Sequence, residues 1–190
     1  KNINMNESRI GIIKILKKMN CKISFKNKKN YKGEPTADIF VKSSNNIKPI
    51  NCSETLNSSA IDEFLLIFIY AAKAKGISKF RNLSELNKKE SPRLDIAVKI
   101  LKMMGIKVKR KKDNINIYGN PNLNLNGNYH IKNYQKDHRV AMTAVIAALA
   151  YGGSWKIEDV KESIKTSFPN FLKIIKILGA KIIWKKEKKL

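Results

Sequence analysis

One pattern, a helix followed by a strand, recurs three times along the chain and constrains the fold more than any other feature. Apolar residues spaced three and four apart predict amphipathic helices at residues 9–20, 93–105 and 171–179. Each ends at a residue that tolerates the left-handed helix cap: Asn20, Gly105 or Gly179. Alternating apolar residues then predict strands at 21–25, 106–110 and 180–184. The spacings of 85 and 74 residues between these ends indicate repeats of a large supersecondary unit and exclude a solenoid.

A second kind of helix alternates with the first. Residues 62–76 and 138–152 are apolar on nearly all sides, which is typical of helices buried all round. Strands are predicted after them, at 77–80 and 155–157, and the Asn-rich stretch 114–134 predicts short strands and turns. The sequence therefore predicts an α/β fold with helices covering sheets, in one domain whose first unit is cut short.

The positive charge invites a nucleic-acid interpretation, but its composition weakens that interpretation. The formal net charge is +24, and 34 of the 39 basic residues are lysine. Lys, Ile and Asn, which share A/T-rich codons, together make up 82 of the 190 residues. The lysines are also scattered over every segment. We attribute the charge mainly to base-composition drift and solvated faces, and keep a nucleic-acid-binding basic domain as the alternative.

Other classes are excluded more firmly. The longest apolar run, residues 64–72, is too short to cross a bilayer, and no secretory signal opens the chain. Two cysteines cannot form a disulfide framework or a four-cysteine zinc site, and the two histidines lie far apart, so we expect no metal. Because the chain starts at Lys1 and not at methionine, we expect it to be a fragment.

Charged residues at three predicted helix starts are the candidates for chemistry. Asp62 is predicted in the first turn of a buried helix, and Asp137 as an N-cap; acids are ordinary at both places. Ser91 is predicted as another N-cap with Pro92 at the first helical position. Arg93 and Arg139 would then lie in first turns, where a cation opposes the helix dipole by about 0.3–1 kcal/mol. Either surface ion pairs offset this cost, or the two arginines hold an anion.

These segments carry a resemblance to a known family. Lys89-Glu90-Ser91-Pro92-Arg93 resembles the Lys-Glu-Ser/Thr-Asp-Arg motif of 5-enolpyruvylshikimate-3-phosphate synthases, and residues 137–142, Asp-His-Arg-Val-Ala-Met, match that family's Asp-His-Arg-Ile/Met-Ala-Met motif. Ile61-Asp62-Glu63-Phe64 and Ser167-Phe-Pro-Asn-Phe171 resemble two further family segments. Residues 34–39, Glu-Pro-Thr-Ala-Asp-Ile, are similar to a Glu-Pro-Val-Ala-Asp-Ile stretch in the glyphosate-insensitive branch of the family. The sister family that acts on UDP-N-acetylglucosamine shares the fold but not the pair of long motifs.

The resemblance implies a fold and a reaction. The fold is a two-lobed, inside-out α/β barrel in which each lobe has three βαβαββ repeats; residues 1–190 would be most of one lobe, with the first repeat truncated and the other lobe absent. The reaction transfers the enolpyruvyl group of phosphoenolpyruvate to the 5-hydroxyl of 3-phosphoshikimate and releases phosphate, without a cofactor. It belongs to the shikimate pathway of aromatic amino acid biosynthesis, in the cytoplasm. The resemblance implies a monomer that binds neither nucleic acid nor membrane.

The resemblance also implies roles for five residues. Asp62 would bind the shikimate hydroxyls and accept a proton, and Glu90 would protonate the methylene carbon. Lys89 would contact both substrates, while Arg93 and Arg139 would hold phosphoenolpyruvate. The chain departs from the family pattern at Pro92, which replaces an Asp, and at Asn87, which replaces a common Arg. The family segments Lys-Ser-x-x-x-Arg and Ser-Ser-Gln of the other lobe are missing, so the isolated chain is expected to be an inactive remnant.

Overall fold

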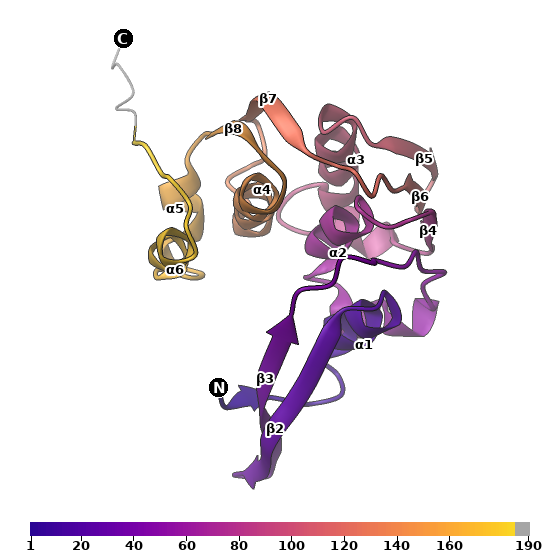
Figure 1. The fold of residues 1–190 in the computed structure, drawn as a ribbon, viewed down its shortest axis with the longest axis vertical. Coiled ribbons are helices and arrows are strands. Elements are labelled where there is room, and N and C mark those ends of the chain that lie inside the picture. Colours follow the sequence, from indigo (N-terminus) through magenta and orange to yellow (C-terminus); the bar gives the residue numbers. More distant parts are fainter. Residues whose placement is uncertain (185–190) are drawn as a thin grey trace. The chain divides into compact units, whose positions relative to one another are not determined.

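Three short sheets and the helices beside them make up residues 1–184, the part of the chain that the structure, a computed structural model, describes (Figure 1). They fall into a first unit, residues 1–125, and a second unit that starts at Asn126. Each unit is described by itself.

The first sheet of the first unit is antiparallel. It contains β1 (Ile3–Asn4), β2 (Lys22–Tyr31) and β3 (Glu34–Lys42) in the order β1-β3-β2. The helix α1 (Gly11–Lys18) lies between β1 and β2 in the chain and buries Ile15 completely. The predicted strand at 21–25 is confirmed and continues to Tyr31 beyond a register shift between Lys26 and Lys29.

The second sheet contains β4 (Ile77–Phe80), β5 (Lys107–Lys111) and β6 (Asn114–Tyr118), in the antiparallel order β4-β6-β5. Two helices belong to it, α2 (Phe64–Ala71) and α3 (Arg93–Met103). A parallel bridge from Asn51 to Lys79 supplies one more strand position. The chain order is therefore bridge, α2, β4, α3, β5, β6, which is one βαβαββ repeat.

Aromatic rings fill the core of this repeat. The helix α2 is apolar on every side, so it is buried rather than amphipathic. Phe68 and Phe80 lie 5.0 Å apart, and Phe64 and Phe80 lie 6.0 Å apart, both with edge-to-face rings. Short 3₁₀ helices connect the larger elements: η1 (Glu54–Leu56), η2 (Ser58–Ala60) and η3 (Ser84–Lys88).

The second unit repeats the start of that order: a strand, a helix, a second strand and then helices. It contains β7 (Leu125–Ile131) from its second residue on, α4 (His138–Tyr151) and β8 (Gly152–Ile157), followed by α5 (Val160–Lys165) and α6 (Phe171–Ile177). The strands β7 and β8 form a two-stranded sheet, in which the rings of Tyr129 and Trp155 stack 4.7 Å apart.

All three predicted left-handed helix ends are confirmed. The φ angle is 70° at Asn20, 76° at Gly105 and 100° at Gly179. In each case the amide of the next residue donates a hydrogen bond five residues back, over 2.9–3.1 Å, to Leu16, Leu101 or Ile175. This is the Schellman cap, so the three repeats end their amphipathic helices by the same device.

Two predicted elements differ from the structure. Residues 180–184 form no strand in the described part of the chain, and Ile183 and Trp184 are 70% and 52% exposed. Alternating residues need a neighbouring strand to pair their backbone groups, and the described residues provide none there. The predicted helix 62–76 is also shorter, because α2 begins only at Phe64 and ends at Ala71.

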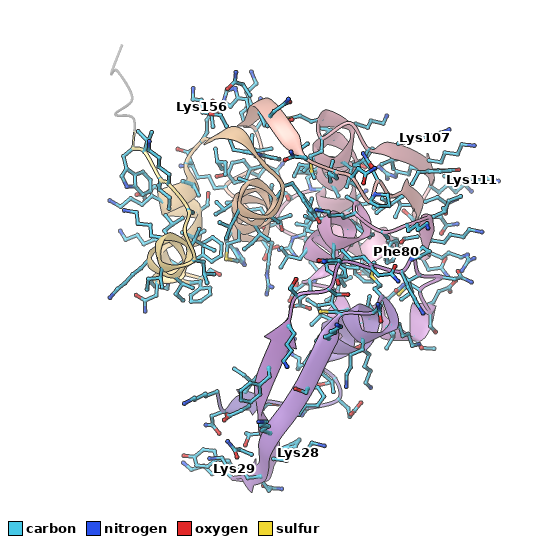
Figure 2. The ribbon with its side chains drawn as sticks, in the orientation of Figure 1. Lys28, Lys29, Phe80, Lys107, Lys111 and Lys156 are labelled. Carbon is cyan, nitrogen blue, oxygen red and sulfur yellow. The ribbon has the colours of Figure 1, made fainter. Side chains whose placement is uncertain are left out.

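The lysines are spread over many elements. Figure 2 labels Lys28 and Lys29 on β2, Lys107 and Lys111 on β5, and Lys156 on β8. This distribution agrees with solvated faces rather than with one basic stripe. No helix within residues 1–184 combines the length and the apolar character needed to cross a membrane.

Candidate functional site

Four charged side chains predicted from the sequence meet in the first unit. Asp62 lies in the turn before α2, and Lys89, Glu90 and Arg93 lie around the start of α3. Arg93 Nη1 lies 3.1 Å from Asp62 Oδ1, and Lys89 Nζ lies 4.0 Å from the same oxygen. The other guanidinium nitrogen, Nη2, pairs with Glu90 Oε2. We call these four residues the charged cluster.

Arg93 is the buried centre of the cluster. Its side chain is 2% exposed, whereas the Asp62 side chain is 27% exposed. A guanidinium stays charged at any ordinary pH, so burying it requires acceptors. Asp62 and Glu90 provide them from two sides, and the planar fork of Arg93 holds both carboxylates in defined positions.

The other members of the cluster reach solvent to different extents. The Lys89 side chain is 32% exposed and the Glu90 side chain 57% exposed. Two carboxylates beside two cations can exchange protons with a bound molecule, and the cations can hold an anion. The arrangement therefore suits acid–base chemistry on an anionic ligand.

The local structure at α3 differs from the sequence prediction in one respect. Pro92, not Ser91, is the N-cap residue, and Arg93 is the first helical residue. The predictions of Ser91 as the N-cap and of Pro92 as the first helical residue are therefore both wrong by one position. Arg93 still lies in the first turn, as predicted. The prediction for Asp62 is also corrected, because it precedes α2 instead of lying in its first turn.

Arg139 lies in the second unit. The N-cap prediction for Asp137 is confirmed, since its Oδ1 accepts a hydrogen bond of 2.9 Å from the Arg139 amide. Arg139 is half-buried in the first turn of α4, as predicted. The structure thus brings four of the five candidate residues together in the first unit and describes the fifth at a capped helix start in the second.

Asn87 is notable in the sequence only as a departure from the family pattern, and its contact with the start of α3 was not predicted. Its side-chain oxygen lies 3.0 Å from the Leu94 amide nitrogen, across the loop that carries Lys89 and Glu90. Residues 86–90 give no indication of this contact in their sequence. An N-cap is normally recognised directly before the helix, whereas Asn87 lies six residues before the first residue of α3. Within residues 1–184 no group of three or more His, Cys, Asp or Glu side chains is placed to hold a metal ion.

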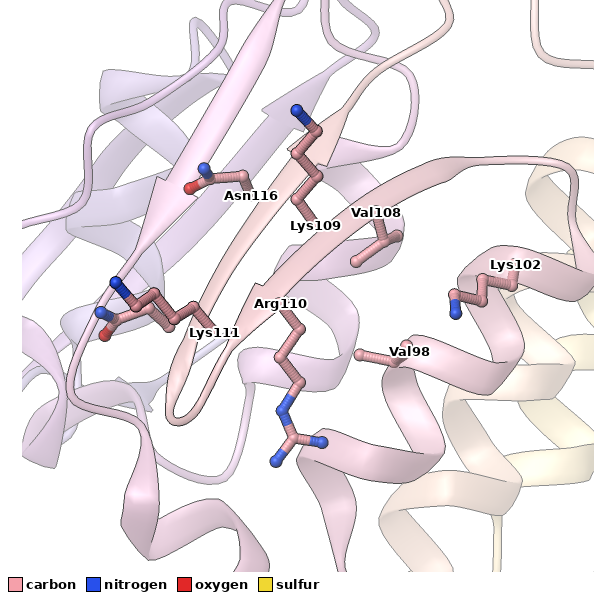
Figure 3. A pocket seen from close by; sticks show the side chains of 8 residues that line it. Val98, Lys102, Val108, Lys109, Arg110, Lys111 and Asn116 are labelled. Carbon is pink, nitrogen blue, oxygen red and sulfur yellow. The ribbon is translucent and has the colours of Figure 1, made fainter.

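A pocket of about 600 Å³ lies elsewhere in the first unit, between α3 and β5 (Figure 3). Val98 and Val108 line it, together with basic side chains that include Lys102 and Arg110. None of the five candidate residues lines this pocket. Its polar lining consists of Lys, Arg and Asn side chains without a carboxylate, so it offers no acid–base pair like that of the charged cluster.

Comparison with known proteins agrees with the fold. The family model described as EPSP synthase (3-phosphoshikimate 1-carboxyvinyltransferase) matches residues 1–175. Among curated relatives, proteins named 3-phosphoshikimate 1-carboxyvinyltransferase from Zymomonas mobilis and Ruthia magnifica are 37% and 38% identical. The matches cover 94% and 95% of this chain but 40% of either relative. The chain therefore spans about two-fifths of the length of these relatives.

Solved structures lead to the same family. An EPSP synthase from Acinetobacter baumannii is 31% identical, with a TM-score of 0.84 over 97% of this chain and 41% of that chain. The enolpyruvyl transferase NikO from Streptomyces tendae, at 16% identity and a TM-score of 0.64 over 90% of this chain and 35% of that one, shows the fold alone. The predicted enolpyruvyl-transferase-like α/β fold is confirmed. The chain belongs to the EPSP synthase family.

Proposed function

We propose that this chain is the part of an EPSP synthase that supplies the proton-transfer groups and much of the phosphoenolpyruvate site. The full protein would transfer the enolpyruvyl group of phosphoenolpyruvate to the 5-hydroxyl of 3-phosphoshikimate and release phosphate. The observation that carries the proposal is the charged cluster, in which Arg93 pairs with both Asp62 and Glu90. The names of the relatives support the same reaction.

Asp62 and Glu90 suit complementary proton transfers. Asp62 would bind the shikimate hydroxyls and accept the proton that the 5-hydroxyl loses as its oxygen bonds to phosphoenolpyruvate. Glu90, with its exposed carboxyl group, would donate a proton to the methylene carbon. One proton must leave the resulting methyl group again as the bond to phosphate breaks, which restores the methylene and releases phosphate. A carboxylate that accepts a proton in one step can donate it in another, so the same group can act first as base and then as acid.

The cations would hold the two anionic substrates together. Arg93 and Arg139 would bind phosphoenolpyruvate, whose carboxylate and phosphate groups match the paired donors of a guanidinium. Lys89 would contact both substrates from its place beside Asp62. Bringing two anions close without a metal requires several fixed positive charges, and their positioning lowers the barrier by placing the reacting atoms near each other.

The rest of the proposal concerns the whole protein. The remaining part of the longer chain would provide most contacts to the 3-phosphoshikimate phosphate, so the 190-residue chain alone would be inactive. We propose a monomer in the cytoplasm that needs no cofactor and binds neither nucleic acid nor membrane. A nucleic-acid-binding role is not favoured, because the family match and the relatives lead to the transferase.

The test is a substrate-dependence assay on the full-length protein. We expect phosphoenolpyruvate to be consumed, and phosphate released, only when 3-phosphoshikimate is present. The 190-residue chain at the same concentration should show no turnover. Phosphate release that does not depend on 3-phosphoshikimate, or no release from the folded full-length protein, would contradict the proposal.

A further inference from the structure

The helix α3 has an unusual start for a helix that carries a functional arginine. Its N-cap residue is Pro92, which has no side-chain oxygen or nitrogen to accept a hydrogen bond. The first backbone amides of a helix lack partners inside the helix, and an N-cap side chain normally accepts from the second or third of them. At α3 these are the amides of Leu94 and Asp95.

Asn87 supplies the missing acceptor from outside the helix. Its Oδ1 lies 3.0 Å from the Leu94 amide nitrogen and 3.4 Å from the Asp95 amide nitrogen. Its Nδ2 donates to Asp95 Oδ1 over 3.3 Å. A single amide side chain thus contacts the first turn of α3 at three points, with its acceptor and its donor both used.

The contact extends to the neighbouring hairpin. Asp95 also pairs with Arg110, whose side chain extends from β5 toward α3 in Figure 3. Arg110 Nε in turn donates to the Lys112 carbonyl over 2.8 Å. Asn87 is therefore linked through Asp95 to β5 as well as to α3, and this network anchors its side chain.

The loop between Asn87 and Leu94 contains two of the residues proposed to act on the substrates. Lys89 and Glu90 lie between Asn87 and Leu94, after η3 ends and before α3 begins. Lys89 has an extended backbone, with φ −82° and ψ −169°, so helical hydrogen bonds do not hold it. We propose that Asn87 is a positioning residue that caps α3 and thereby holds Lys89 and Glu90 in register with Arg93. This inference rests on the function proposed above.

The capping role can be removed and then restored at a different residue. Asn87→Ala removes the remote cap, and Pro92→Asp places a good N-cap side chain at the start of the helix itself. In the full-length protein we expect Asn87→Ala to lower kcat about 10- to 100-fold, the size of effect that small displacements of catalytic groups produce, and to change KM for phosphoenolpyruvate by a smaller factor than kcat. Adding Pro92→Asp should recover most of the lost kcat.

The matched control is Asn120→Ala, which removes a similar side-chain bond, of 3.0 Å to the Asn122 amide, in an exposed turn. It should leave kcat unchanged. If kcat of Asn87→Ala at a temperature far below its unfolding midpoint stays within twofold of wild type, Asn87 is merely structural and the inference is wrong. Failure of Pro92→Asp to raise kcat of the single variant would also overturn it.

Amide hydrogen exchange separates this inference from the proposed reaction. Asn87→Ala should speed exchange at Leu94 and Asp95, and Pro92→Asp should slow it again, whether or not the protein turns over these substrates. Unchanged protection of both amides would refute the cap. Absence of turnover by the wild-type protein would instead refute the proposed function, while the exchange result would still decide the capping role.

Discussion

Arg93 Nη1 lies 3.1 Å from Asp62 Oδ1, although 31 residues separate the two in the chain. The contact joins the first turn of α3 to the turn before α2. The guanidinium is buried and Asp62 is only partly exposed, so this ion pair should contribute both to the stability of the repeat and to the proposed reaction.

Replacing Arg93 should destabilise the fold. Arg93→Met leaves the Asp62 carboxylate partly buried without its main cation, and we expect a loss of about 2–3 kcal/mol, below the roughly 3–5 kcal/mol seen for fully buried pairs. Lys88→Met is the control, since the exposed Lys88–Glu85 pair should contribute no more than about 1 kcal/mol. Urea unfolding of the full-length protein measures both. Equal losses of unfolding free energy in the two variants would show that the buried Arg93 pair stabilises the fold no more than an exposed pair does.

The two carboxyl groups should matter for turnover more than for binding. Asp62→Asn and Glu90→Gln keep the shape of each side chain but remove its ability to transfer a proton. We expect each to lower kcat by about 10²–10⁴-fold, with small changes in KM. Glu7→Gln, at a carboxylate that is 75% exposed, is the control. Steady-state kinetics with both substrates provides the test, and wild-type kcat in either variant would remove that residue from the proposed mechanism.

Arg139 should be irreplaceable by lysine. Lysine keeps the charge but not the two parallel donors that match a carboxylate or phosphate group. Arg139→Lys should weaken phosphoenolpyruvate binding by about 1.5–3 kcal/mol, the range for hydrogen bonds to charged groups. Arg81→Lys, at a side chain bonded to Asn51 in the first unit, should bind normally. Titration calorimetry on the full-length protein compares them, and unchanged affinity of Arg139→Lys would disprove the assignment.

Gly119 should not tolerate a side chain. A Cβ there would clash with the Ala74 carbonyl oxygen and would lie 2.7 Å from that of Ala71, so backbone would have to move. We expect Gly119→Ala to cost more than the roughly 1–3 kcal/mol typical of overpacking. Gly105→Ala meets no atom but has φ 76°, and should cost about 1–2 kcal/mol through backbone strain alone. Thermal unfolding of both variants compares the two losses of stability. A larger loss for Gly105→Ala than for Gly119→Ala would contradict the prediction.

Alkaline pH should weaken the fold through Tyr151. Burial raises the pKa of Tyr151 to about 12, above the value near 10 expected in the unfolded chain. The unfolded state therefore loses this proton first, and the contribution of Tyr151 to stability, complete below pH 10, declines between pH 10 and 12. By pH 11 the decline should reach about 1.4 kcal/mol.

Tyr151→Phe isolates this effect from the titration of other groups. The difference in unfolding free energy between wild type and Tyr151→Phe should be constant up to pH 9 and shift in favour of the variant by pH 11. Urea midpoints at pH 8, 9, 10 and 11 give the comparison. A difference that does not change with pH would mean that the phenol titrates normally.

Much of the local structure could be predicted from periodicity and capping residues. The helices that end at Asn20, Gly105 and Gly179, and the N-cap at Asp137, depend on short-range chemistry that the sequence displays directly. The strand predicted at 180–184 failed for the opposite reason. Its pattern was local, but a strand requires a partner elsewhere in the chain.

The sequence by itself determined the repeated helix-and-strand units, and three of its segments marked the residues proposed for chemistry. Only the tertiary structure decided that Asp62, Lys89, Glu90 and Arg93 meet, that Arg93 is buried between two carboxylates, and that Asn87 caps α3. The physical reason is range. Helix periodicity and caps act over a few residues, whereas a buried ion pair forms only after packing has brought distant segments together and excluded water from them.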